Sequence, residues 1–213
     1  MNSMNNYVIS LKPIIFVLIH GLFDQSAGDN NVSKLKPIIL KYFPNAVIDE
    51  DSADYGWMGA FRASWFYWAT DIIPRISKAL KITEQKKVVI AHSNGANFCM
   101  KALSKISNPE ITCFFLSPAL NARYKFKEEF KSCNVLYSRT DSVVLLAKLV
   151  LFSRMGAMGR YGPLTKDKRV FKADLRDHGI KDHSDYFKPD NHEAAFKPIR
   201  DKIEQELFFE GQK

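Results

Sequence analysis

The chain has 213 residues, of which 46% are apolar and 25% charged. This composition excludes an intrinsically disordered protein, and we expect one domain over residues 1–213. The 31 lysines and arginines exceed the 23 acidic residues, giving a net charge of +8. They are mixed with acidic and apolar residues and form no recognisable nucleic-acid-binding module, so we expect no nucleic-acid partner.

Targeting and redox features point to a cytoplasmic protein. The apolar run at 14–19 is far shorter than the roughly 20 residues of a membrane span, and no signal cleavage site follows it. We therefore expect no integral membrane segment. Cys99, Cys113 and Cys133 fit no zinc-binding spacing and leave one cysteine over. We expect reduced core residues, the alternative being a reactive thiol at Cys133.

Short apolar runs alternate with helical patterns along the chain. In chain order, the predicted elements are a strand at 14–19, a helix at 32–42, a strand at 46–48, a helix at 61–80, a strand at 87–91, a helix at 96–106, strands at 111–116 and 134–137, a helix at 143–152, a strand at 169–175 and a helix at 192–208. Pro37, Pro74 and Pro198 mark late starts or bends. This alternation is typical of a parallel sheet covered by helices on both faces, which binds ligands at the carboxyl ends of its strands.

One candidate nucleophile follows a predicted strand directly. His92-Ser93-Asn94-Gly95 links the strand ending at Ala91 to a helix. On so tight a turn the Ser93 hydroxyl is pushed out of the sheet, and only small residues fit two positions to either side, a need that Ala91 and Gly95 meet. The alternative is that Ser93 caps the helix.

This segment resembles the nucleophile elbow G-x-S-x-G of the α/β-hydrolase superfamily, with Ala91 in place of the first glycine. The resemblance implies an α/β-hydrolase fold, with a mostly parallel central sheet and helices on both faces. It also implies Ser93 as the nucleophile. Because predicted strands and helices fill the interval between Ser93 and Asp141, we expect no large cap domain.

The resemblance extends to an oxyanion loop after the first strand. His20-Gly21-Leu22-Phe23 occupies that place. Acyl transfer needs two backbone N–H groups aimed at the developing oxyanion. By the resemblance one comes from Asn94 and the other from Leu22 or Phe23, while His20 is expected to be architectural.

The acid and the base follow the nucleophile in the chain order of the superfamily. Asp141 lies in the exit loop of the strand at 134–137 and is the implied acid, although it could instead cap the next helix. His183 lies in the loop after the last strand and is the implied base. His178 and His192 remain alternatives.

The resulting hypothesis is a serine hydrolase that cleaves small-molecule carboxylic esters through a Ser93–His183–Asp141 triad and an acyl-enzyme, with no cofactor and no metal. A metal site is disfavoured because the histidines and aspartates near His183 show no recognisable ligand spacing. The alternatives are a thioesterase, lipase or amidase on the same triad, or a non-catalytic binding protein on a hydrolase fold.

Two further segments have open interpretations. The aromatic residues at 57–68 line an acyl pocket or belong to the core. The segment 154–163, rich in glycine and methionine, is a mobile flap or an ordinary surface loop. The oligomeric state is not indicated.

Overall fold

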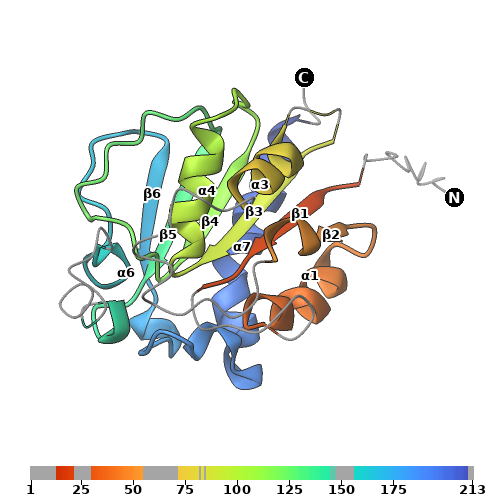
Figure 1. Ribbon diagram of the computed structural model, residues 1–213. Helices are drawn as coiled ribbons and strands as arrows, with labels where there is room; N and C mark the ends of the chain where they lie inside the picture. The colour runs from red at the N-terminus through yellow and green to blue at the C-terminus, as the bar shows by residue number, and fades with distance from the viewer. Residues whose placement is uncertain are drawn as a thin grey trace, which may run out of the picture.

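A six-stranded parallel sheet forms the centre of the described structure. The computed structural model describes residues 13–21, 30–54, 72–81, 83, 85–144, 146 and 156–210. The strands of the sheet are β1 (Ile15–Ile19), β2 (Val47–Asp49), β3 (Lys87–His92), β4 (Thr112–Leu116), β5 (Ser132–Tyr137) and β6 (Val170–Asp174). They lie in the order β2-β1-β3-β4-β5-β6, and each neighbouring pair is parallel (Figure 1).

The strand order reverses at β1. After β1 the chain adds β2 on one side, and it then returns to add β3 on the other side. In a parallel sheet such a reversal opens a crevice at the carboxyl ends of the two strands that flank it. His20 and Gly21 follow β1 there, and Ser93 follows β3.

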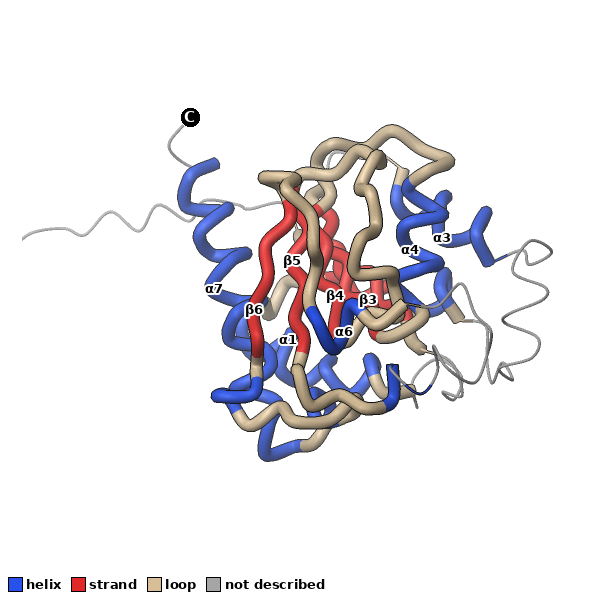
Figure 2. Tube along the Cα trace, turned by 90° about the vertical axis from the view of Figure 1, so that its left-hand side faces the viewer, coloured by secondary structure: helices blue, strands red, loops and turns tan. Residues whose placement is uncertain are grey.

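Helices cover both faces of the sheet. One face packs against α3 (Ile72–Leu80) and α4 (Gly95–Leu103), and the other packs against α1 (Lys36–Tyr42) and α7 (His192–Glu210). Figure 2 looks onto the β6 edge and shows α7 on one side of the sheet and α3 and α4 on the other. This two-sided burial is why the central strands read as continuous apolar runs in the sequence.

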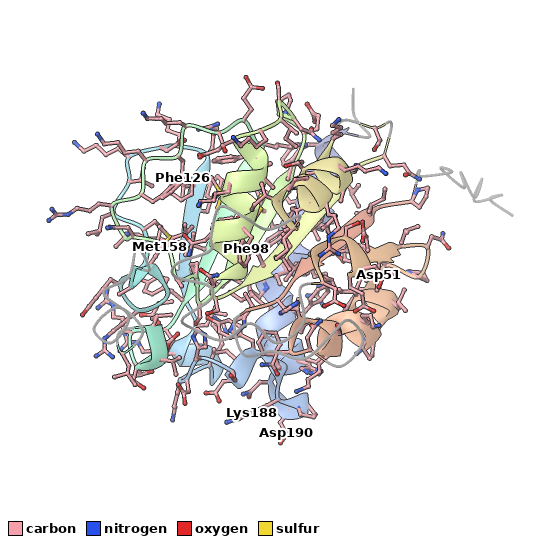
Figure 3. The ribbon with its side chains drawn as sticks, in the orientation of Figure 1. Asp51, Phe98, Phe126, Met158, Lys188 and Asp190 are labelled. Atoms are coloured by element: carbon pink, nitrogen blue, oxygen red, sulfur yellow. The ribbon has the colours of Figure 1, made fainter. Side chains whose placement is uncertain are left out.

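Alternate side chains of each strand enter different cores. In β3, Val89 and Ala91 join the cluster formed with α3 and α4, whereas Val88 and Ile90 join the cluster with α1 and α7. The first cluster also contains three residues labelled in Figure 3, namely Phe98, Phe126 and Met158. Cys99, Cys113 and Cys133 lie buried and unbridged in the same cluster, as expected for core cysteines.

The strand predictions are confirmed, with shifts of one or two residues at their ends. The predicted helix at 32–42 divides into a 3-10 turn, Val32–Leu35, and α1, which has Pro37 in its first turn, where a missing N–H costs nothing. The predicted helix at 61–80 is described only from Ile72, and most of the one at 143–152 also lies outside the described residues. No helix in the described part of the chain is long and apolar enough to cross a membrane.

A buried carboxylate fastens α7 to the amino ends of the strands. The Glu206 side chain is 6% exposed and pairs with Lys86 at 3.1 Å. Its two oxygens accept hydrogen bonds from Thr112 Oγ1 at 2.8 Å and from Ser132 Oγ at 3.1 Å. These contacts lie at the end of the sheet opposite the crevice and tie α7 to β4 and β5.

We expect Glu206→Gln to lower the free energy of unfolding by about 2 kcal/mol, because a buried ion pair loses its anion. Glu204→Gln is the matched control on the same helix: its side chain is 56% exposed, so little change is expected. Urea unfolding at pH 7 measures both. Equal effects of the two substitutions would contradict a specific role for Glu206.

Candidate active site

Ser93 forms the turn between β3 and α4. Its φ of 53° lies in the left-handed region, which a residue other than glycine occupies only when its surroundings hold it there. Those surroundings are the end of β4 and the loop after it. Ser93 N donates to Leu116 O at 3.0 Å, and Ser93 O accepts from Ala119 N at 3.0 Å. The Ser93 side chain remains partly exposed on this sharp turn.

The close approach of α4 to β1 explains the need for small residues around Ser93. A Cβ on Gly95 would lie 2.5 Å from Ile19 O and 2.6 Å from His20 O, distances that backbone atoms do not tolerate. Ala91 is fully buried. The size requirement predicted from the sequence therefore has a direct structural cause at Gly95.

The segment after β1 lies against Ser93. A Cβ on Gly21 would be 3.0 Å from Ser93 Cβ, so the backbone passes very close to the serine. His20 is buried, and its Nδ1 lies 2.9 Å from Gly21 O, which fits an architectural role. Leu22 and Phe23 lie outside the described residues. Among the residues that the structure does describe, none accepts a hydrogen bond from the Asn94 backbone N–H.

Asp141 and His183 are brought together from separate loops. Asp141 is fully buried, and its Oδ2 lies 2.8 Å from His183 Nδ1. The other oxygen, Oδ1, accepts from Val143 N at 3.0 Å, so the aspartate also caps the turn that follows it. Because Nδ1 donates to the carboxylate, the lone pair of the neutral His183 ring lies on Nε2.

A second carboxylate shapes the turn that contains His183. Asp185 Oδ2 accepts from Lys181 N at 2.9 Å and Asp182 N at 2.8 Å, and Oδ1 pairs with Lys188 Nζ at 2.5 Å. Burial alone would raise the pKa of Asp185, but these hydrogen bonds outweigh it and hold the pKa below its usual value. Figure 3 labels Lys188 and Asp190 in the turns that follow His183.

Further polar contacts fix the same turn to the loop after β5. Lys181 O accepts from Thr140 Oγ1 at 2.5 Å and from Ser138 Oγ at 3.2 Å, and His183 N donates to Asp182 Oδ1 at 2.7 Å. The carboxylates of Asp182 and Asp185 thus bond to backbone N–H groups and to Lys188. Among the described residues, no group of three or more histidine, cysteine, aspartate or glutamate side chains is arranged to hold a metal ion.

The other two histidine candidates lie elsewhere. His178 is exposed in the 3-10 turn Arg176–His178, and His192 begins α7. In the part of the chain that the structure describes, no direct hydrogen bond joins Ser93 Oγ to the His183 ring. His92, which directly precedes Ser93, contacts His183 instead, with ring centroids 4.5 Å apart. Direct hydrogen bonds between a serine and its base are often long in enzymes without substrate.

Comparison with solved structures decides the fold. A protein of Xanthomonas campestris assigned to the alpha/beta hydrolase superfamily aligns with a TM-score of 0.51 at 12% identity, over 91% of this chain and 99% of that one. The chain has the α/β-hydrolase fold. The family models and curated proteins compared with the sequence give no match.

Two further structures share the hydrolase fold. A dienelactone hydrolase-like promiscuous phosphotriesterase from metagenomic libraries gives a TM-score of 0.53 at 11% identity, over 92% of this chain and 87% of that one. Esterase B from Lactobacillus rhamnosis gives a TM-score of 0.50 at 10% identity, over 94% of this chain and 79% of that one. At identities of 10–11%, these similarities support a shared fold and nothing finer.

The described part of the segment 154–163 is fastened to the hydrolase fold. It contains the short helix α6 (Met158–Tyr161), and its Gly156 N and Gly159 N donate at 2.8 Å to Ala119 O and Pro118 O. A Cβ on Gly156 would lie 2.2 Å from backbone atoms of Asn121. Residues 156–163 are thus packed structure, whereas Arg154 and Met155 and the aromatic residues at 57–68 lie outside the described residues.

Two residues of this site were missed in the sequence. His92 occupies the variable position of the elbow motif, although a histidine at the end of the buried apolar run 88–91 is a usable signal. Asp185 is one of several aspartates near His183 in the sequence, and its spacing gives no indication that it binds two backbone N–H groups.

We expect Asp185→Asn to lower the free energy of unfolding at pH 7 by about 1–2 kcal/mol, because the charge-assisted hydrogen bonds are weakened. The folded-state pKa is depressed, so the stabilisation by Asp185 is complete above its unfolded-state pKa and is lost as the pH falls through the folded value. The gap between wild type and variant should therefore narrow below about pH 4. Urea unfolding from pH 7 to pH 3 tests this, with the exposed Asp190→Asn as the control. A gap independent of pH would contradict the assignment.

Proposed function

We propose that this protein is a serine hydrolase that cleaves small-molecule carboxylic esters, with Ser93 as nucleophile, His183 as base and Asp141 as the orienting acid. The observation that carries the proposal is the buried 2.8 Å contact between Asp141 Oδ2 and His183 Nδ1, on a ring that lies beside the residue preceding Ser93. The pair joins the loop after β5 to the turn that contains His183, and His183 in turn contacts His92, the residue directly before Ser93.

The first step is activation of Ser93. With Nδ1 bonded to Asp141, the free nitrogen of His183 is Nε2, and it takes the proton of the Ser93 hydroxyl as the oxygen attacks the carbonyl carbon of the ester. Asp141 keeps the imidazole in this tautomer and stabilises its charged form. Its complete burial strengthens that interaction.

The developing oxyanion needs donors that are already in place. The backbone N–H of Asn94 lies directly after the nucleophile, at the start of α4, where the helix dipole adds partial positive charge. Leu22 or Phe23 is proposed to supply the second N–H, because both follow Gly21 in the chain and Gly21 lies close to Ser93. His183 then protonates the leaving alcohol and activates the water that releases the acid.

Esters are the first substrate class to test by analogy of fold alone. An esterase and a phosphotriesterase are named among the proteins of similar fold. Thioesters, lipid esters and amides use the same machinery and belong in the same substrate panel. A binding protein that retains the site without turnover is the remaining alternative.

A fluorophosphonate should add covalently to the wild-type protein at one site and not to Ser93→Ala. The attack by Ser93 on phosphorus follows the same activation as attack on a carbonyl. Intact-mass measurement of both proteins, each checked for folding by circular dichroism, gives the result. Absence of an adduct on folded wild type would contradict an activated Ser93 and favour the binding protein.

The base assignment has its own test. We expect His183→Gln to lower kcat for p-nitrophenyl acetate by about 10³-fold or more, because the general base is lost. His178→Gln should retain activity, since His178 is exposed in a neighbouring turn. The reverse pattern would transfer the role to His178.

A further inference from the structure

His92 links the candidate nucleophile to the candidate base. It is the last residue of β3 and precedes Ser93 directly, and it is 3% exposed. Its Nε2 lies 3.1 Å from the backbone oxygen of His183, and the two rings lie 4.5 Å apart between centroids. Because a carbonyl oxygen only accepts, Nε2 carries the proton and donates this hydrogen bond.

The remaining sides of the His92 ring are enclosed. Phe187 contacts it edge-to-face, with centroids 4.8 Å apart and an interplanar angle of 84°. On the Nδ1 side, a Cβ on Gly21 would approach to 3.1 Å. Within the described part of the chain, Nδ1 has no hydrogen-bond partner. Protonation of Nδ1 would place a buried cation there with no acceptor among the described residues.

The His92 ring is therefore neutral. Burial first, and then the neighbouring His183 and His20, hold the pKa of His92 well below its usual value, against the opposing hydrogen bond to His183 O. Among the groups that face it, His183 is the one that gains a proton in the proposed mechanism. A neutral neighbour adds no repulsion when that proton arrives.

We propose that His92 is a positioning residue that sets the place of His183 relative to Ser93. This inference rests on the proposed function. Asp141 holds the His183 ring at Nδ1, but it belongs to the loop after β5 and has no bond to the elbow. His92 instead joins the elbow to the backbone of His183, so its hydrogen bond fixes the position of His183 relative to Ser93. A displacement of about 1 Å between such groups is enough to slow catalysis strongly.

Two nearly isosteric substitutions isolate the hydrogen bond. His92→Gln places an amide N–H as many bonds from Cα as Nε2 of histidine, whereas His92→Met fills similar space without a donor. We expect His92→Met to lower kcat for p-nitrophenyl acetate by about 10- to 100-fold with little change in KM. His92→Gln should stay close to wild type, and His178→Gln is the control for loss of an exposed histidine.

Fluorophosphonate labelling separates positioning from folding. For His92→Met we expect a lower labelling rate constant, while the final labelled fraction stays near that of wild type. A reduced final fraction labelled at the wild-type rate would show that His92 only maintains the fold, and would overturn the inference. If the methionine and glutamine variants had the same labelling rate constant, whether near that of wild type or well below it, the role of the hydrogen bond would also be overturned. Absence of labelling in the wild type would instead overturn the proposed function.

Discussion

The close passage of α4 over the end of β1 is the constraint on which the rest of the site depends. A Cβ on Gly95 would lie 2.5 Å from Ile19 O and 2.6 Å from His20 O, so there is no room for a side chain where the turn between β3 and α4 passes the end of β1. The turn is compressed into Ser93, which takes a left-handed φ. Leu116 O at the end of β4 and Ala119 N in the loop after β4 hold that conformation through hydrogen bonds to the Ser93 backbone.

The surroundings of His183, the proposed base, differ from those of Ser93, the proposed nucleophile. The serine is fixed by sterics, whereas His183 lies in a turn whose peptide groups are held by side chains. Such a turn depends on charge and hydrogen bonding, and a hydrogen bond from His92 to His183 O joins it to the end of β3. The turn that contains Ser93 and the turn that contains His183 thus meet at the ring of His92. A serine in a strained backbone conformation is thus combined with a histidine whose turn depends on the ionised carboxylate of Asp185.

The central strands were predictable because both faces of the sheet are buried there. An apolar run such as 88–91 has few other stable environments in a folded chain. The elbow was predictable for a similar reason, since only small residues fit beside it. The start of β5 was missed because Ser132 is polar, and its burial depends on Glu206, which is distant in sequence. His92 and Asp185 were missed because their roles arise from loops that meet only in the folded chain.

The two glycines before and within α6 have a consequence beyond their own segment. Gly156 and Gly159 each lie where any side chain would overlap backbone atoms of the loop after β4. That same loop provides the Ala119 N–H that holds the carbonyl of Ser93. A bulky residue at either glycine would displace the loop and loosen the strained turn. Few substitutions should therefore be tolerated at Gly156 and Gly159, even though these residues lie far along the chain from Ser93.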